Sequence, residues 1–313
     1  MAAALPVVSG FSRIVSRFSR TIRSLRHRLE SWMVYGLATV VRLLPVPAVR
    51  SLGAMIGGVV YHLDGFHRRI ALANVALALP SKLEKERRAV VKRAFAHFGS
   101  VLLELIKVGT LSDQDILDRI EAEGEERVRQ AHARGRGVLL FTGHFGHWEV
   151  GAIALALRFQ PMAVMARPLD NPHLHGMLER IRTRSGNSVI YRQGAIRKVL
   201  QELAANRGVA ILIDQHLHTD AVYVDFFSRP AATTNALAAV ALRTGAPVIP
   251  AFALPLPNGR YRLVYEHAVE PPASDSPEAV KEFTQRCTDV LEMYIRRHPD
   301  LWLWMHRRWR LDA

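Results

Sequence analysis

Helical spacing of apolar residues dominates the start of the chain. Residues 10–29 place apolar side chains three and four positions apart, with arginines between them and no acidic residue before Glu30. Such a basic amphipathic helix is typical of segments that lie in the interface of an anionic membrane. An organelle transit peptide, which is removed before folding, has a similar composition and is the alternative interpretation.

Residues 32–63 are mostly apolar, but Arg42, Pro45, Pro47 and Arg50 interrupt the run. No uninterrupted stretch reaches the roughly 18 residues needed to cross a bilayer. The pattern predicts two short helices embedded in, or lying on, one leaflet. A soluble helical hairpin packed on the core fits the same pattern, and the basic segment just before it favours the membrane.

Two further helices are predicted before residue 110. Residues 67–80 have helical spacing that ends at Pro80, and residues 81–108 have it again. Ser81 followed by Glu84 three positions later predicts an N-cap with a capping box for the second helix.

The pattern changes near residue 137, where short apolar runs begin to alternate with helical segments. This alternation predicts an α/β domain with a mostly parallel, buried sheet flanked by helices. Chemistry in such sheets collects at the carboxyl ends of the strands. We therefore divide the chain into membrane-associated helices (1–65) and a second domain (66–313), with a helical lead-in (66–124) and an α/β core (125–313). The predicted strands are 137–142, 161–166, 188–190, 208–213, 246–254 and 261–266.

Composition adds a strong charge signal. The 313 residues are 49% apolar, which is enough for a sizeable core, and the formal net charge is +14. A charge of that size indicates an anionic partner, such as nucleic acid, an acidic membrane surface or an acidic protein. The single cysteine, Cys287, excludes an internal disulfide, and its helical context predicts inert packing.

The most informative motif follows the first predicted strand. His144 lies on the loop after that strand, and Glu149 lies near the start of the next helix, with Gly143 and Gly146 allowing a sharp turn. We expect the glutamate to accept one imidazole N–H, which leaves the other nitrogen free as a base. A His–carboxylate pair without its own nucleophile suits deprotonation of a substrate hydroxyl. The alternative is a helix cap and a solvated side chain.

A metal site is another interpretation of the histidines. His216, His218 and Asp220 spell H-x-H-x-D, the start of the metallo-β-lactamase signature, but Ala221 stands where a further histidine is required. We therefore expect a polar loop there and no metal. A second set of possible ligands is His144, His147 and Glu149.

The C-terminal segment interleaves aromatic and basic residues. Such mixing suits single-stranded nucleic acid, a membrane interface, or tryptophans packed inside with arginines facing out. Since no other segment resembles a nucleic-acid-binding module, we expect no nucleic acid partner. The residues are Trp302, Trp304, Arg307, Arg308, Trp309 and Arg310.

Taken together, these segments resemble the bacterial lipid A late acyltransferases, the lauroyl and myristoyl transferases of lipopolysaccharide assembly. The resemblance covers about residues 30–310, with the segments in the family's order. It rests on "RRIALANVALALP", "GHFGHWE", "ARPLDNPHLHGMLERIRTRSGNSVI", "GVAILIDQ", "VDFFSRPAATTNALAAVALRTGAPVIPAF" and "HPDLWLWMHRRWR".

The resemblance implies a glycerol-3-phosphate-acyltransferase-like α/β fold on the cytoplasmic face of the inner membrane. His144 and Glu149 match the family's catalytic pair, Arg167 matches an active-site arginine, and Asp214 matches an acidic site residue. The run after Asp214, "QHLHTDAVYVDFF", departs from the family's glycine-rich and basic run. A glutamate at 149 favours the lipid A branch over related enzymes that acylate mannosylated phosphoinositides.

The implied reaction moves an acyl chain from a thioester on acyl carrier protein, or on coenzyme A, to a hydroxyl of a lipid A precursor. No step requires a metal or an organic cofactor. Arg167 is expected to stabilise the oxyanion or bind an acceptor phosphate, or else only to pair with Asp170. Asp214 is expected to orient Arg167, or else to cap a loop. The alternatives are a different glycolipid or phospholipid acceptor, and a non-catalytic protein that binds lipid or nucleic acid.

Overall fold

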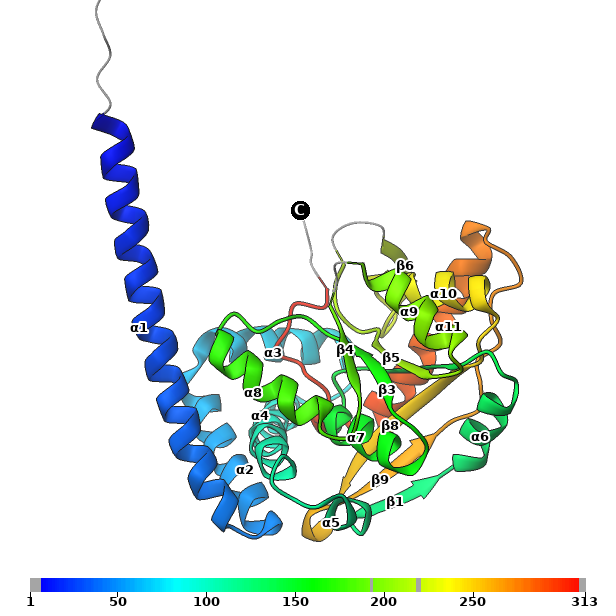
Figure 1. The fold of residues 1–313 in the computed structure, drawn as a ribbon, viewed down its shortest axis with the longest axis horizontal. Coiled ribbons are helices and arrows are strands. Elements are labelled where there is room, and N and C mark those ends of the chain that lie inside the picture. Colours follow the sequence, from blue (N-terminus) through cyan, green and yellow to red (C-terminus); the bar gives the residue numbers. More distant parts are fainter. Residues whose placement is uncertain (1–6, 192–193, 218–220, 310–313) are drawn as a thin grey trace, which may run out of the picture.

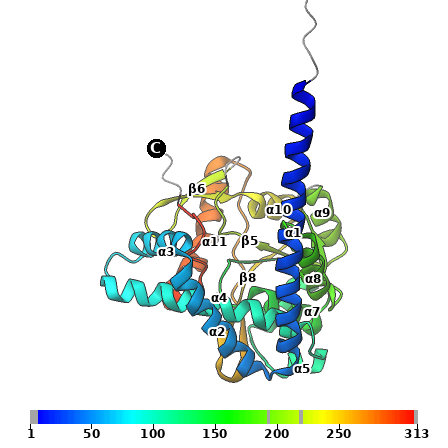
Figure 2. The ribbon, with the colours of Figure 1, turned by 90° about the vertical axis from the view of Figure 1, so that its left-hand side faces the viewer.

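The computed structural model describes residues 7–191, 194–217 and 221–309, with side chains from residue 25 onwards. Helix α1 (Val7–Leu43) is a single helix that projects far beyond the rest of the molecule (Figures 1 and 2). Helix α2 (Val46–Leu63) follows after a short turn at Pro45. The expectation of two short helices within residues 32–63 is therefore wrong for the first of them. Because nothing between Glu30 and Leu43 breaks a helix, this part continues the basic helix without interruption.

Helix α2 packs closely along helix α4 (Glu84–Val108). Three glycines make the contact possible, because a Cβ on Gly53, Gly57 or Gly99 would lie under 3.0 Å from backbone atoms of the other helix. Arg50 adds a hydrogen bond and ion pair to Glu104 of α4. One side of α2 is thus fixed to the protein, while its other side stays exposed.

Helix α3 (Gly65–Ala78) ends just before Pro80, as predicted. Its N-cap is Asp64, whose carboxylate accepts a hydrogen bond from the backbone N–H of His67 at 3.0 Å. The predicted capping box of α4 is displaced along the chain. The helix begins after Leu83, whose backbone N–H donates to the Glu86 carboxylate, so Ser81 is not its N-cap.

The sheet has seven strands in the order β1-β9-β8-β2-β5-β3-β4. Strands β8, β2, β5, β3 and β4 run parallel to one another, while β9 is antiparallel to β8 and β1 is parallel to β9. The predicted mostly parallel α/β sheet is confirmed. The strands are β1 (Ile120–Glu123), β2 (Val138–Thr142), β3 (Met162–Met165), β4 (Ser188–Ile190), β5 (Gly208–Leu212), β8 (Val248–Leu256) and β9 (Arg260–Tyr265).

All six predicted strands are present, and three strands were not predicted. Strand β1 is short and charged, and β6 (Ala221–Asp225) with β7 (Pro230–Thr234) forms a separate antiparallel pair. The remaining helices are α5 (Asp113–Leu117), α6 (Glu125–Ala133), α7 (Trp148–Arg158), α8 (Pro172–Thr183), α9 (Ala195–Ala204), α10 (Ala236–Thr244) and α11 (Pro277–Arg297), with 3₁₀ turns η1 (Pro257–Gly259) and η2 (Pro299–Leu301).

Alternating side chains along the strands pack into two hydrophobic cores, one on each face of the sheet. On β2, Leu139 and Phe141 join the core under α9, α10 and α11, while Val138 and Leu140 join the core under α6 and α7. Both faces of the central strands are therefore buried, as parallel sheets require. The layers are visible in Figure 1.

The aromatic C-terminal segment packs inside the protein. The side chains of Trp302, Trp304 and Trp309 are all buried, so these indoles are not available for stacking on a nucleic acid base. Arg307 faces out as expected, but Arg308 is buried against Phe226 and donates to the Ala232 carbonyl at 2.6 Å. Arg310 lies outside the described residues.

Candidate active site

The loop between β2 and α7 carries His144 at the carboxyl edge of the sheet. Two glycines shape this loop. A Cβ on Gly143 would lie 2.9 Å from the Asp214 carboxylate, and a Cβ on Gly146, which has a φ of +59°, would lie 2.1 Å from the Ala253 carbonyl oxygen. The loop can thus pass close to both the sheet and an acidic side chain only because these positions lack side chains.

Asp214 follows β5, the parallel neighbour of β2, so both loops leave the same edge of the sheet. Its Oδ1 lies 2.8 Å from Nδ1 of His144, and its Oδ2 accepts from the His144 backbone N–H at 2.7 Å. The indole N–H of Trp302 also donates to Oδ2 at 2.8 Å. Because an ionised carboxylate only accepts hydrogen bonds, this geometry places the imidazole proton on Nδ1 and leaves Nε2 without one.

Each of the two groups stabilises the charged form of the other. Burial alone raises the pKa of Asp214, but the charge and hydrogen bond of His144, with His306 and Trp302, hold that pKa well below its usual range. Burial lowers the pKa of His144, and the charge of Arg182 lowers it slightly further. The charge and hydrogen bond of Asp214, with the charge of Glu149, outweigh both and raise the pKa above its usual value. His144 is therefore a stronger base than a free imidazole.

The other ring nitrogen of His144, Nε2, lies on the side of the ring away from Asp214. The side chain is 14% exposed, and within the described part of the chain Nε2 makes a long contact of 3.4 Å to the Gln215 amide. The ring lies edge-on to Trp148, with centroids 5.2 Å apart. A nitrogen in this position can accept a proton from a bound hydroxyl group.

Glu149 does not make the hydrogen bond that the sequence predicts. Its carboxylate accepts from Nε of Arg182 at 2.9 Å and also binds the Arg182 terminal nitrogen. Glu149 lies in the first turn of α7, where the half-buried guanidinium of Arg182 from α8 binds it, while Asp214 already occupies Nδ1 of His144. Glu149 acts on the imidazole only through its charge.

Arg167 lies on the loop after β3, at the same edge of the sheet, because β3 pairs with β5. Its side chain is 86% exposed and pairs with Asp170 at 3.4 Å. This contact is the ion pair named above as the alternative, and the hydrogen bonds of Asp214 go to His144 and Trp302 and not to Arg167.

The possible metal ligands do not assemble within the described part of the chain. Among those residues, no three His, Cys, Asp or Glu side chains are grouped so as to hold a metal ion. His147 is fully buried and caps α7, accepting from the Val150 N–H at 3.4 Å. His218 and Asp220 of the H-x-H-x-D run lie outside the described residues.

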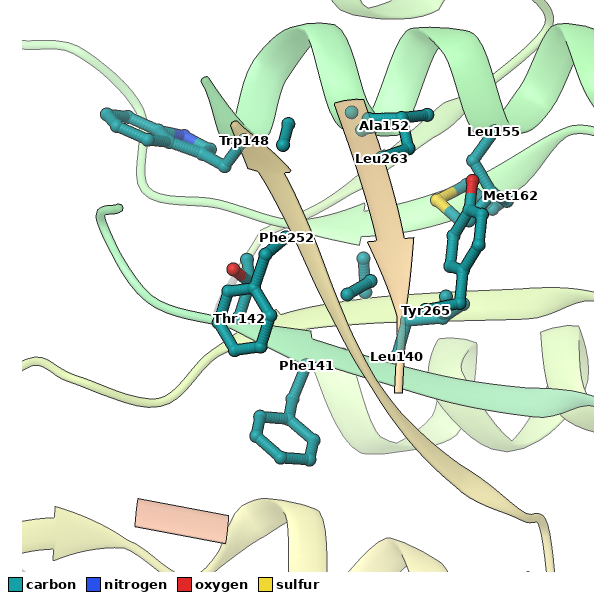
Figure 3. A pocket seen from close by; sticks show the side chains of 14 residues that line it. Leu140, Phe141, Thr142, Trp148, Ala152, Leu155, Met162, Phe252, Leu263 and Tyr265 are labelled. Carbon is teal, nitrogen blue, oxygen red and sulfur yellow. The ribbon is translucent and has the colours of Figure 1, made fainter. Parts of the chain in front are cut away.

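A narrow apolar cavity of about 50 Å³ lies between α7 and the sheet. Figure 3 shows Trp148 at one end of it and Met162 and Tyr265 at the other. A second cavity of about 50 Å³ also reaches Trp148, and Glu149 and Arg182 lie on its wall. Trp148, whose ring contacts that of His144, therefore lies on the wall of both hollows.

Sequence reasoning missed Arg182, Trp148 and Trp302. Trp302 lies far along the chain from His144 and Asp214, so only the fold shows their contact. The apolar strands before His144 and Asp214 did signal that both lie at the carboxyl edge. Their pairing required the strand order, in which β2 and β5 are neighbours.

Comparison with known proteins finds relatives that match nearly the whole chain. Residues 15–311 match the family described as "Bacterial lipid A biosynthesis acyltransferase". The lipid A biosynthesis lauroyltransferase of Escherichia coli is 28% identical over 94% of this chain and 95% of its own. The lipid A biosynthesis myristoyltransferase of the same organism is 25% identical over 94% of this chain and 90% of its own.

A solved structure, the 1-acyl-sn-glycerophosphate acyltransferase PlsC from Thermotoga maritima, covers 80% of this chain and 98% of its own at 15% identity, with a TM-score of 0.37. That likeness is distant. The family match, in contrast, spans nearly the whole sequence, including every residue of the site. The chain therefore belongs to the bacterial lipid A biosynthesis acyltransferase family and is an acyltransferase.

Proposed function

We propose that the protein transfers a fatty acyl chain from an acyl thioester to a hydroxyl group of a lipid A precursor, with His144 as the general base. The observation that carries this proposal is the imidazole held at Nδ1 by Asp214, with its ring against Trp148, which lines an apolar cavity. The family match supports the lipid A precursor as acceptor.

The reaction needs one base and no covalent enzyme intermediate. Nε2 of His144 takes the proton of the acceptor hydroxyl while its oxygen attacks the thioester carbonyl carbon. The tetrahedral intermediate collapses with cleavage of the C–S bond, and the imidazolium returns its proton to the leaving thiolate. Asp214 stabilises the imidazolium that forms in between, in the manner of the carboxylate in a Ser-His-Asp triad.

The charge that develops on the carbonyl oxygen needs a nearby donor. Arg182 lies on the wall of the second cavity, where Glu149 fixes its guanidinium. We assign this stabilisation to Arg182, with Glu149 holding it in place. Arg167, exposed at the same edge, is available to bind a phosphate of the acceptor, since guanidinium groups bind phosphate with two parallel hydrogen bonds.

The acyl chain would enter past Trp148 along the cavity under α7, which must widen to admit it, since even a cavity of about 150 Å³ holds only a benzene ring. Its lining is almost wholly apolar and runs from Trp148 to Tyr265 (Figure 3). An apolar slot with a defined far end discriminates between acyl chains by length. The two E. coli relatives are named for different acyl chains, lauroyl and myristoyl. Membership of the family therefore does not fix the length of the acyl chain that this protein transfers.

The donor is a thioester of acyl carrier protein or of coenzyme A, and the charge of the protein favours the acidic carrier protein. A net charge of +14 attracts an anionic protein over a long range and speeds the encounter between the two. Rates with acyl carrier protein should therefore fall more steeply with salt than rates with the smaller thioester.

The membrane-facing surface is formed by the outer sides of α1, α2 and α3. Its apolar side chains are exposed, with Arg26 and Arg42 beside them. Helix α2 is the one helix in the described residues that is long and apolar enough to cross a membrane. Because α2 is packed along α4, we propose that it lies in the cytoplasmic face of the inner membrane. The exposed residues are Leu25, Leu29, Trp32, Met33, Tyr35, Val40, Leu43, Met55, Val59, Val60, Leu63 and Phe66.

The test is acyl transfer by the purified protein in detergent or vesicles, with acyl-carrier-protein thioester and a lipid A precursor, followed by mass spectrometry of the lipid. The mass added to the lipid names the acyl chain. His144→Ala should abolish transfer in a protein that still folds, as circular dichroism checks, although loss of the partner of the buried Asp214 should lower its thermal stability. Transfer at the wild-type rate by that variant would overturn the proposal.

A further inference from the structure

The C-terminal segment lies directly along the loop that carries His144. The backbone N–H of Gly146 donates to the Leu301 carbonyl at 2.9 Å, and that of Leu303 donates to the His144 carbonyl at 3.0 Å. Between these bonds, Phe145 and Trp302 face each other as an antiparallel bridge. The segment therefore acts as a short strand added to the loop.

Trp302 is the residue of this segment that contacts the acidic partner of the base. Its indole is fully buried, and its N–H donates to Oδ2 of Asp214 at 2.8 Å. Oδ2 has one other donor, the backbone N–H of His144, and Oδ1 receives the imidazole. The ring of His306 adds a contact of 3.1 Å to the Asp214 backbone carbonyl.

The indole of Trp302 is packed among other rings and cannot turn away. It lies edge-on to Trp304, with ring centroids 4.6 Å apart, and edge-on to Phe226, at 5.5 Å. The segment is tied to helix α3 as well, because the Asn74 amide donates to the carbonyls of Trp304 and His306, each at 2.8 Å. A buried donor with so little freedom is suited to fixing the orientation of a carboxylate.

We propose that Trp302 is a positioning residue for acyl transfer, which holds the Asp214 carboxylate at the angle that keeps the proton of His144 on Nδ1. The inference rests on the proposed role of His144 as the base. Trp302 itself does not reach the outward nitrogen of His144. It acts through Asp214.

Loss of the indole N–H has a defined electrostatic result. The other titratable groups that act on Asp214 are His144, His306 and Arg308, and those that act on His144 include Glu149 and Arg182. None of them replaces a donor to Oδ2. A carboxylate with one donor fewer attracts the imidazole proton more strongly, so the pKa of His144 rises further and the base is protonated up to a higher pH.

The test replaces Trp302 by phenylalanine, which keeps an aromatic ring and removes the N–H. We expect kcat to fall on the order of 10–100-fold, as for a lost hydrogen bond to a charged group, with KM unchanged. The acid limb of the pH–rate profile should move to higher pH. The matched control is Trp309→Phe. Trp309 stacks on Phe226 in the same cluster, and its indole N–H has no hydrogen-bond partner among the described residues.

A smaller ring leaves space in a packed core, so a second replacement separates the hydrogen bond from the packing. Benzothienylalanine at position 302 has the shape of tryptophan with sulfur in place of the N–H, and it should reproduce both the lower kcat and the shifted acid limb. The proposal is overturned if the isostere has wild-type kcat and the wild-type profile. His144→Ala is measured in the same assay: an active His144→Ala defeats the proposed function, whereas an inactive one beside a wild-type isostere defeats only the role of Trp302.

Discussion

Asp214 lies 2.8 Å from Nδ1 of His144, although 70 residues separate them along the chain. Adjacent strands β2 and β5 bring the two together, and Gly143 lets the carboxylate reach the loop. Glu149, only five residues from His144, instead forms an ion pair with Arg182. The carboxylate that orients His144 is thus the distant residue, Asp214, while the nearby Glu149 binds the guanidinium of Arg182.

The Glu149–Arg182 pair should be important for stability as well as for activity. Their side chains are 8% and 16% exposed, so removing one leaves the other charge mostly buried. Glu149→Ala should destabilise the protein by about 3–5 kcal/mol, and Arg182→Met by a similar amount. The double variant should lose clearly less unfolding free energy than the two single variants lose together. Denaturant unfolding of the wild type, the two single variants and the double variant measures this difference. Additive losses would show that the pair is not coupled.

Acid should weaken the fold through two histidines, the fully buried His147 and the half-buried His97. Burial lowers the pKa of His97 to about 4, although its hydrogen bond to the Gly146 carbonyl opposes this, and burial lowers the pKa of His147 to about 3. Between pH 6.5 and these values the unfolded chain binds protons that the folded chain does not. The stability that these histidines contribute is therefore present above their unfolded pKa and is lost as the pH falls through this window.

His97→Gln tests that origin, because glutamine can still donate to the Gly146 carbonyl oxygen that His97 contacts at 3.1 Å. From about pH 6.5 down to about pH 4.5, the unfolding free energy of this variant should fall less steeply than that of the wild type. The two slopes should differ by up to about 1.4 kcal/mol per pH unit. His62→Gln, at an exposed position, should keep the wild-type slope. An unchanged slope in His97→Gln would contradict the assignment.

Chain-length preference should depend on the far end of the cavity under α7. Leu155 lines that cavity, at the end away from Trp148 (Figure 3). Leu155→Phe should lower kcat/KM for the longest accepted donor by about 10-fold or more, while shorter donors react at nearly the wild-type rate. Competition between acyl donors of different length measures the ratio. Leu157→Phe, on the same helix but not in the cavity lining, should leave the ratio unchanged, and an equal loss for all donors would place the acyl chain elsewhere.

Membrane binding should depend on the exposed apolar faces of α1 and α2. Leu43 and Leu63 are 85% and 80% exposed, so charges there cost the fold little. The double variant Leu43→Glu, Leu63→Glu should no longer float with vesicles that contain anionic lipid, while its soluble fraction increases. Leu83→Glu, Leu102→Glu, exposed on and beside α4, is the comparison. Flotation of the first variant as strong as that of the wild type would argue against this surface.

The sequence allowed most of the fold to be predicted, since period-2 and period-3.6 patterns are strong for the buried strands and long helices. Prediction failed where the structure depends on contacts between residues that are far apart in the sequence. The charged strand β1 is held at an edge by pairing with β9, and α4 begins after Leu83 and not at the apparent Ser81 cap. The His144–Glu149 spacing suggested a pair because local spacing is all that a sequence displays. The partner from the neighbouring strand and the donor from Trp302 depend on the strand order.

The most direct measurement compares Asp214→Asn with Glu149→Gln in steady-state acyl transfer. Oδ2 of Asp214 accepts two N–H groups, so the amide oxygen of asparagine must occupy that position, and its NH₂ group then faces Nδ1 of His144. This forces the proton to Nε2 and removes the base, with an expected fall in kcat on the order of 10⁴-fold, as for the same change in a serine-protease triad. Glu149→Gln keeps an oxygen that can bind Arg182, so its kcat should fall far less than that of Asp214→Asn. If Glu149→Gln abolishes transfer while Asp214→Asn stays near the wild-type rate, then Glu149 orients the base and Asp214 does not.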